Sequence, residues 1–267
     1  MPLYRDPDAT QPNVAPALFR MLRQQQRKVS PEDLVSYFYA VLAHPPYTER
    51  FWDELETCEI RVPITKDPKL FREGVAIGRR LIWLHTYGER LVPDGRIPGD
   101  VPAGAARCLA PVPAKPEHYP ESFAYDPAAR EIRIGANDLF AEPAGRFGPV
   151  SREVWEFEVS GLKVVQSWLA YRMRDRKGKK TSPLDDIYPE RWTREFTTEF
   201  LRLLSILEAT VAGYPAQRDL LQRICAGPLF AASDFPDPPA HMRKAPSTRG
   251  ANQVEFEFDP GDDEAQV

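Results

Sequence analysis

Residues 161–192 read GLKVVQSWLAYRMRDRKGKKTSPLDDIYPERW, and the interpretation of the whole chain depends on this stretch. Its first part carries apolar residues at helical spacing, which predicts an amphipathic helix over residues 162–174. Arg and Lys make up six of the nine residues at 172–180, and Gly178 lets the tip bend. The apolar face that would fix the helix consists of Val165, Trp168 and Leu169.

The basic loop has two interpretations. A run of cations is commonly a solvated surface, and that interpretation stays open. A loop rich in arginine on a rigid base can instead pair with phosphate groups or with guanine in the major groove. The sequence favours neither by itself, but Arg172 and Arg176 continue the apolar face outward. The candidate DNA-binding residues are Arg172, Arg174, Arg176, Lys177, Lys179 and Lys180.

The N-terminal third of the chain has helical patterns. Ser30 precedes Pro31 and two acidic residues, which is typical of a helix start because serine caps free amides and proline fits the first turn. Asp67 and Pro68 begin the strongest helical pattern in the same way. The expected helices cover residues 15–27, 31–43, 47–57 and 68 onward, and residues 59–64 are an expected short strand.

The middle of the chain differs, because proline and glycine are frequent between residues 93 and 150. Short runs with β character lie among them, and residues 154–159 alternate strictly between apolar and polar side chains. The final third is helical again. The expected strands are 107–113, 122–125, 131–134 and 154–159, and the expected later helices are 162–174, 193–212 and 216–225.

These patterns predict an α+β fold in which helical N- and C-terminal parts flank a Pro/Gly-rich, β-containing middle. The 28 prolines indicate many connections between short elements. The expected parts are a helical N-terminal part at 1–92, a β-rich insert at 93–160, a helical part with the basic loop at 161–230, and a disordered acidic tail at 231–267.

The formal charge of −4 hides an asymmetry. Residues 255–267 hold six acidic residues and no basic one, so the rest of the chain has 33 acidic against 35 basic residues. Phosphate binding requires a local basic patch and not a basic protein, so the overall charge does not exclude a nucleic-acid partner. A second possibility is that the acidic tail occupies the basic loop when DNA is absent.

Other features bound the compartment and the class of protein. Three distant cysteines and four scattered histidines form no zinc pattern, and an odd number of cysteines suggests a reducing compartment. The N-terminus lacks the apolar region of a signal peptide, and no apolar stretch approaches the ~20 residues of a membrane helix. We therefore expect a soluble, cytoplasmic protein with no membrane partner.

His44-Pro45-Pro46-Tyr47 resembles the Asn/Asp/Ser-Pro-Pro-Tyr motif of methyltransferases that act on exocyclic amines. In that motif the amide or carboxylate of the first residue binds the amine through hydrogen bonds. The imidazole of His44 cannot form the same contacts. No glycine-rich loop follows a strand to bind S-adenosylmethionine. The sequence therefore favours a corner in which Pro45 and Pro46 end one helix and start the next.

Two further candidates have structural explanations. His85, at the end of the long helix, has no catalytic partner nearby in the sequence, which favours a packed or capping histidine. Asp185 and Asp186 could ligate a metal or serve a nuclease, but no Glu-x-Lys follows, and turn chemistry is favoured. We therefore predict no catalytic residue, no cofactor and no metal site.

Several blocks of the chain are similar to the C-terminal specificity, or target-recognition, domain of type ISP restriction–modification enzymes. The similarity extends over about residues 2–230. The residues that carry it are GL (161–162), SWLAYR (167–172), SPLDDI (182–187), PERWT (189–193), PLY (2–4), YFYAVLAHPPYTERF (37–51), and LF (70–71) through Gly78, Leu84 and His85.

The resemblance implies a domain that recognises a DNA sequence for an attached adenine DNA methyltransferase and nuclease. It also implies double-stranded DNA as partner and no catalysis by this chain alone, because the upstream catalytic domains of the family are missing. Residues 59–63 (EIRVP) depart from the expected Pro-Arg-Ile-Pro pattern. The chain would then be a split subunit, a gene remnant or an excised domain.

Two other functions remain open at this point. The chain could be a protein-interaction subunit that docks on a separate methyltransferase or helicase chain, or part of an adenine methyltransferase whose catalytic domain lies elsewhere. The recognised sequence and the oligomeric state do not follow from the residues. Weaker candidates for base contacts in the β-rich middle are Arg107, Arg130, Arg133, Asn137 and Arg146.

Overall fold

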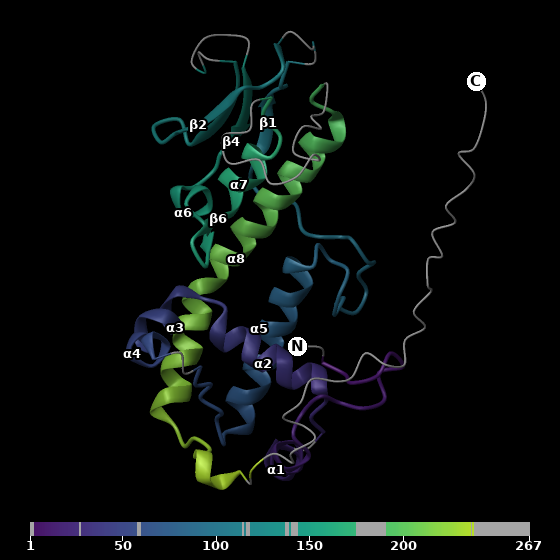
Figure 1. Cartoon of the computed structure of the whole chain (residues 1–267), viewed down its shortest axis with the longest axis vertical. Coiled ribbons are helices and arrows are strands. Elements are labelled where there is room, and N and C mark those ends of the chain that lie inside the picture. Colours follow the sequence, from purple (N-terminus) through teal and green to yellow (C-terminus); the bar gives the residue numbers. More distant parts are fainter. Residues whose placement is uncertain are drawn as a thin grey trace, which may run out of the picture. The chain divides into compact units, whose positions relative to one another are not determined.

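The computed structural model describes residues 3–26, 28–57, 60–113, 115, 118–136, 139, 144–174, 191–235 and 237 (Figure 1). The chain divides into two compact units. The first comprises residues 1–32 and 230–267, and the second comprises residues 33–229.

The first unit contains α1 (Pro16–Gln26) and the short 3-10 helix η3 (Ala232–Asp234). A turn precedes α1, in which Asp6 Oδ2 accepts hydrogen bonds from the Thr10 amide at 2.8 Å and from the Thr10 hydroxyl at 2.9 Å. These bonds satisfy backbone groups that no helix or sheet would satisfy. α1 agrees with the helix expected over residues 15–27.

The second unit contains all other helices and strands of the described chain. Its helices are α2 (Pro31–Leu42, from residue 33 on), α3 (Pro45–Arg50), α4 (Trp52–Glu56), α5 (Pro68–His85), α6 (Arg152–Trp155), α7 (Val164–Ala170) and α8 (Arg194–Ala226). Its strands are β1 (Arg107–Ala110), β2 (Ser122–Asp126), β3 (Glu131–Gly135), β4 (Gly145–Gly148), β5 (Glu158–Val159) and β6 (Leu162–Lys163). The expected α+β class is confirmed.

Four strands form one antiparallel sheet in the order β1-β4-β3-β2 (Figure 1). The inner face of this sheet carries Ile132, Ile134 and Phe147, which are fully buried. They pack against α6, α7 and the N-terminal half of α8, and Phe147 meets Phe200 edge-on with ring centroids 5.0 Å apart. This core positions the start of the basic loop, because α7 belongs to it.

The helical half of the second unit is organised by α5 and α8. Ser36 of α2 approaches α5 at Gly78, where a Cβ atom would lie 1.7 Å from the Ser36 carbonyl oxygen. The amide of Gln217, on α8, donates to the carbonyl of Ala40 at 3.0 Å. α8 therefore serves both the sheet core and this helical core.

Four expectations about single elements were wrong. Residues 60–64 form no strand, because tyrosine hydroxyls satisfy their backbone: Tyr47 donates to Arg61 O and Tyr37 donates to Pro63 O. Residues 154–159 begin in α6, because Ser151 caps that helix by accepting from the Val154 amide at 3.2 Å, and only β5 follows as strand.

Pro215 does not divide the last helix, although the sequence predicted two helices there. α8 continues to Ala226, and the residues after the proline bury Leu220, Leu221 and Ile224. Burial of three such side chains contributes more than the roughly 3 kcal/mol that a proline costs in a helix interior. The helix expected from residue 162 begins only at Val164, after strand β6.

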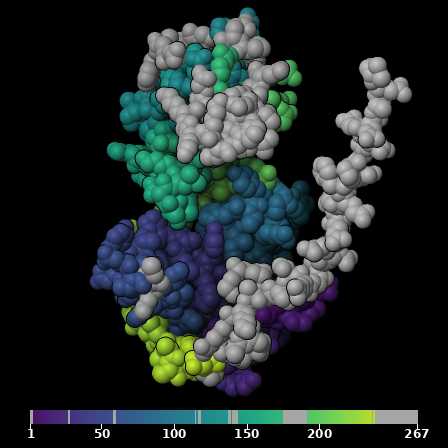
Figure 2. All heavy atoms as spheres, in the orientation of Figure 1, coloured from purple at the N-terminus to yellow at the C-terminus, as the bar shows by residue number. Residues whose placement is uncertain are grey.

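The β5–β6 hairpin lies on the surface of the second unit (Figures 1 and 2). Ser160 and Gly161 both have positive φ, 50° and 83°, which is the geometry of a two-residue hairpin turn. Its apolar residues Val159 and Leu162 are 55% and 56% exposed. None of the helices in the described ranges combines the length and apolar composition that crossing a membrane requires.

Candidate nucleic-acid interface

The basic loop starts from an aromatic cluster at the end of α7. Arg172 lies over Trp168, with Cζ 3.6 Å from the ring centroid, and 5.1 Å from that of Phe196. Its Nη1 donates to the Trp168 carbonyl at 3.0 Å, and its Nη2 approaches Glu199 Oε2 at 3.4 Å. The hydroxyl of Tyr119 donates to Arg172 O at 2.8 Å. Arg172 therefore fastens the start of the loop to α8 and to the segment before β2.

The environment of Arg172 is not that of an open phosphate ligand. Its side chain is 21% exposed, and burial lowers its pKa, while the Glu199 carboxylate acts in the opposite direction. Its buried Nε has no hydrogen-bond partner among the described residues. The expectation that Arg172 continues the helix face outward is therefore wrong, because the guanidinium folds back over Trp168.

Arg174 is also engaged, but it is more accessible. Its amide donates to Pro120 O at 2.8 Å, and its Nη1 lies 3.3 Å from Glu121 Oε1. Its side chain remains 38% exposed. Arg174 is the last described residue before position 191, and these contacts hold it beside the start of β2.

The far end of the loop returns to the same cluster. Trp192 is buried, and its indole N–H donates to Thr197 Oγ1 at 2.9 Å. Its ring lies 6.2 Å from that of Trp168 and 5.6 Å from that of Phe196, edge-on in both pairs. Trp168 itself stacks on Phe200 with ring centroids 4.9 Å apart. Both ends of the loop are therefore fixed at one aromatic base, which the predicted apolar face of α7 supplies in part.

The intervening residues, 175–190, lie outside the described part of the chain. Of the six predicted site residues, only Arg172 and Arg174 therefore lie in the described part of the chain. The other four, Arg176, Lys177, Lys179 and Lys180, fall in the undescribed stretch, as do Asp185 and Asp186.

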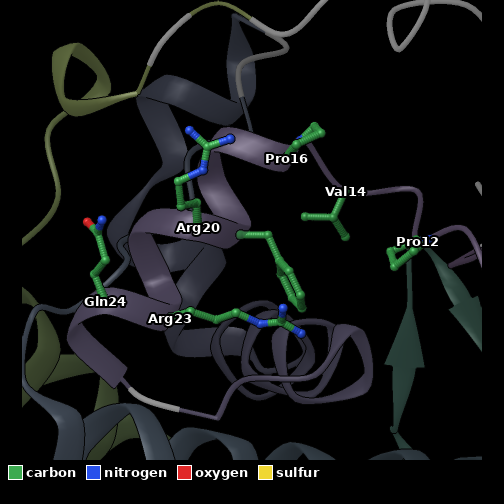
Figure 3. A pocket seen from close by; sticks show the side chains of 7 residues that line it. Pro12, Val14, Pro16, Arg20, Arg23 and Gln24 are labelled. Atoms are coloured by element: carbon green, nitrogen blue, oxygen red, sulfur yellow. The ribbon is translucent and has the colours of Figure 1, made fainter.

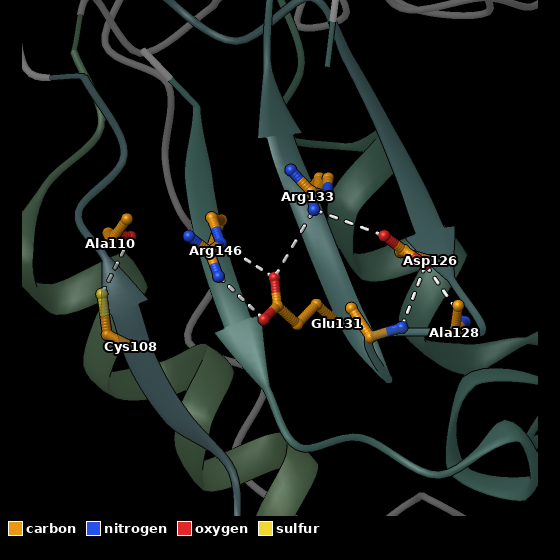
Figure 4. Close-up of polar contacts among 8 residues, drawn as sticks. Cys108, Ala110, Asp126, Ala128, Glu131, Arg133 and Arg146 are labelled. Carbon is orange, nitrogen blue, oxygen red and sulfur yellow. Dashed lines mark hydrogen bonds and ion pairs between the residues drawn. The ribbon is translucent and has the colours of Figure 1, made fainter. Parts of the chain in front are cut away.

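The outer face of the sheet carries an ion-pair network (Figure 4). Arg133 and Arg146 are opposite each other on β3 and β4. Glu131 binds Arg146 in a bidentate pair, with contacts of 2.8 and 2.9 Å, and lies 3.9 Å from Arg133. Arg133 also pairs with Asp126 at 3.3 Å. The hydrogen bond from Arg146 holds the pKa of Glu131 below its usual value.

This network changes the role of the weaker candidates. Two facing arginines would repel each other, and the shared carboxylate of Glu131 separates them, so these side chains support the sheet. Arg107 donates to backbone carbonyls, including Ala106 O at 2.8 Å. Arg130 is exposed, with φ of 56°, and Asn137 lies outside the described residues.

His44 is a structural residue, as predicted. It is the N-cap of α3, and its Nδ1 accepts from the Tyr47 amide at 3.2 Å. Pro45 and Pro46 are the first residues of α3, and only Ala43 and His44 separate them from the end of α2 at Leu42. The corner interpretation of HPPY is confirmed.

His85 joins three helices. The Tyr39 hydroxyl lies 2.7 Å from its Nδ1, and its Nε2 lies 2.9 Å from Thr210 Oγ1. The Thr210 hydroxyl already donates to Ile206 O at 2.8 Å, so Thr210 accepts from Nε2–H, and Nδ1 accepts from Tyr39. Burial lowers the pKa of His85. This chain of bonds uses both ring nitrogens for packing.

The described residues contain no cluster of His, Cys, Asp and Glu side chains suited to a metal ion. Cys108 and Cys225 are free thiols, and Cys58 lies outside the described part. The sequence did not predict the contacts that Tyr119 and Glu199 make with Arg172. Trp168 and Trp192 flank the basic run in the sequence, and a contact between these two side chains could have been predicted from their positions.

A sequence model of the family described as "Type ISP C-terminal specificity domain" matches residues 1–203. A comparison with curated protein sequences gives no significant match. A solved structure described as "ATP-dependent Type ISP restriction-modification enzyme LlaBIII bound to DNA" is similar in fold, with a TM-score of 0.44 and 12% sequence identity. The similarity covers 82% of this chain and 12% of that chain.

Proposed function

The chain belongs to the family of type ISP C-terminal specificity domains, and from this premise we propose that it is a DNA target-recognition module without catalytic activity of its own. In this proposal it directs an adenine DNA methyltransferase and nuclease to a specific sequence. Double-stranded DNA is its partner, and no cofactor or metal takes part.

The closed base of the basic loop is the observation that carries this proposal. Trp168 and Trp192 lie on either side of the loop and pack edge-on, 6.2 Å apart. A loop whose ends are fixed loses less conformational freedom when it binds than a loop with free ends. The chain therefore presents its densest group of cations from a rigid support, which an ordinary solvated charge run does not require.

The six basic residues have different roles in this proposal. Arg172 and Arg174 position the loop, because their side chains and backbone are bound to Trp168, Glu199, Pro120 and Glu121. Arg176, Lys177, Lys179 and Lys180 contact phosphate groups. Such contacts fix the register of a protein on the duplex, while base contacts give specificity.

The test replaces Arg176, Lys177, Lys179 and Lys180 together by glutamine and measures binding of a fluorescent duplex across a range of salt concentration. Each lost phosphate contact should reduce the slope of log K against log [salt] by about 0.9. The four-residue variant should therefore bind more weakly and with a flatter salt dependence. Binding and slope equal to those of the unchanged protein would refute the role of the loop.

A matched control removes four cations from α5 and the segment after it: Lys69, Arg72, Arg80 and Arg90, all exposed. Replacing them by glutamine changes the net charge equally and should alter the slope much less. If both variants lose the same affinity, the attraction is a property of total charge. If no duplex binds the unchanged chain while a methyltransferase or helicase chain does, the protein-interaction function is correct instead.

A further inference from the structure

A hollow of about 530 Å³ lies along α1 in the first unit (Figure 3). Its walls are largely apolar, and they are formed by one face of α1 and by the segment that leads into it. Phe19 is only partly buried there. The residues that line the hollow are Pro12, Val14, Pro16, Phe19, Arg20, Arg23 and Gln24.

The charged groups at this hollow are of one sign. Arg23 lies over Phe19, with Cζ 4.1 Å from the ring centroid, and its Nε donates to the Val29 carbonyl at 3.2 Å. Arg20 is exposed. Within the described ranges, neither arginine has a carboxylate partner. Among the described residues that line the hollow, none is acidic. An occupant should therefore combine apolar side chains with negative charge.

The chain itself contains a segment with these properties. Residues 255–259 read Glu-Phe-Glu-Phe-Asp, which alternates acidic and aromatic side chains. We propose that the hollow along α1 is the intramolecular docking site of residues 255–259, with Phe256 and Phe258 against Phe19 and the carboxylates on Arg20 and Arg23. In an extended segment, residues two apart share one side, so Phe256 and Phe258 can face the apolar wall together. The carboxylates then lie on the other side of the segment, where the long, exposed side chains of Arg20 and Arg23 can reach them.

The chain can reach this site. Residues 230–267 belong to the same compact unit as α1, and η3 with Asp237 are the last described parts of the C-terminal segment. The residues between positions 237 and 255 can span on the order of 50 Å when extended. A linker of this length keeps the segment at a high effective concentration near α1 of the same unit.

Charge alone would also allow the acidic segment to bind a different site. The same acidic residues could associate with the cations of the basic loop, Arg176, Lys177, Lys179 and Lys180. That loop offers charge, but the hollow offers charge and an apolar wall, and burial of two phenylalanine rings adds a favourable term that phosphate-binding lysines cannot supply. The proposal does not depend on DNA recognition.

The test places one 4-fluorophenylalanine at position 258 of the full chain and records its ¹⁹F resonance. A free peptide of residues 251–263 with the same label gives the unbound reference. We expect a shifted and broadened resonance in the full chain. The double variant Arg20→Glu/Arg23→Glu should return it to the reference, and adding Glu255→Arg/Glu257→Arg to that variant should restore the shift.

The matched control is Lys28→Glu, an exposed cation of the same unit that does not line the hollow. This change should leave the resonance shifted. A full chain whose resonance equals that of the free peptide would overturn the proposal. So would a resonance that ignores Arg20 and Arg23 but responds to glutamine at Arg176, Lys177, Lys179 and Lys180, because the segment would then lie on the basic loop.

Discussion

Arg172 and Trp168 form a cation–π pair, with the guanidinium carbon 3.6 Å from the ring centroid. The pair is partly desolvated, since Arg172 is 21% exposed and burial lowers its pKa. A cation–π contact of this kind contributes from about 0.5 to about 2 kcal/mol, depending on desolvation. The same guanidinium donates to Trp168 O and approaches Glu199, so one side chain links α7, the loop and α8.

Arg172→Lys should lower the free energy of unfolding by about 1–2 kcal/mol, because an ammonium lacks the planar surface and the fork of donors. Urea denaturation measures this loss. Arg174→Lys serves as the control, since Arg174 and its partner Glu121 are 38% and 29% exposed and pairs near the surface contribute about 0–1 kcal/mol. Equal losses of unfolding free energy in the two variants would mean that the contacts of Arg172 with Trp168 and Glu199 contribute no more than a surface ion pair.

Glu131 should be more important to the sheet than either arginine that it binds. Glu131→Gln leaves Arg133 and Arg146 facing each other without their shared carboxylate, and the expected loss of stability is about 1–3 kcal/mol. In the folded protein, Arg146 holds the pKa of Glu131 below the usual value of a glutamate. The pair therefore stabilises the fold fully at a pH above the usual pKa. This stabilisation is lost as the pH falls through the pKa of the folded protein.

A double-mutant cycle measures the interaction between Glu131 and Arg146 separately from the effect of each single substitution. Glu131→Gln and Arg146→Gln, alone and combined, should give a coupling energy of roughly 1 kcal/mol in chemical denaturation. Arg152→Gln is a suitable comparison, because its pair with Glu156 is 75% and 47% exposed. Additive losses for Glu131 and Arg146 would show that their bidentate contact contributes nothing to stability.

The sequence was sufficient where local chemistry decides the structure. Asp67 before Pro68 predicted the start of α5, and Asp67 Oδ1 accepts from the Lys69 amide at 2.7 Å. The proline corner after His44 and the α+β class were predicted for the same reason. Caps and prolines act over one or two residues, so a single sequence contains all that they need.

The errors occur where distant residues satisfy the backbone. Residues 60–64 alternate like a strand, but Tyr37 and Tyr47 supply their partners from positions that no local pattern identifies. The site shows the same limit. The basic run was visible in the sequence, whereas the folding back of Arg172 depends on Phe196 and Glu199, which follow more than twenty positions later.

Gly78 should be intolerant of any side chain. A Cβ atom there would lie 1.7 Å from Ser36 O and 2.4 Å from Ser36 C, which are backbone atoms that a rotamer change cannot move. Gly78→Ala should therefore force α2 and α5 apart and lower the free energy of unfolding by at least about 1–3 kcal/mol.

Gly213 provides the opposite case in α8. Apart from its own helical turn, no described residue has an atom within 4 Å of a Cβ built on Gly213, so Gly213→Ala should stabilise the protein by about 0.5–1 kcal/mol through helix propensity. Thermal unfolding of the two variants checks both signs. A stable Gly78→Ala protein would mean that α2 and α5 do not pack at the distance found here.

Acid should destabilise the helical half of the second unit through His44, which is buried, and His85, which is partly buried. Burial, followed by the charge of Arg218, lowers the pKa of His44 from 6.5 to about 4, and burial alone lowers that of His85. In the unfolded chain both imidazoles bind a proton near their usual value, while the folded protein resists protonation. The unfolded state therefore binds more protons below that value, and stability falls as the pH decreases.

For His44 the loss should reach about 3 kcal/mol between its usual pKa and its folded value, at 1.36 kcal/mol per unit. His44→Asn keeps a side chain that can cap α3 but does not titrate, so its stability should depend less on pH over this range. The difference between the two urea denaturation curves, measured at several pH values, isolates His44 from the carboxylates that also titrate. The remaining slope in the variant contains the part due to His85, which His85→Gln should reduce. Parallel curves for the unchanged protein and His44→Asn would mean that His44 binds its proton equally well in the folded and unfolded chain.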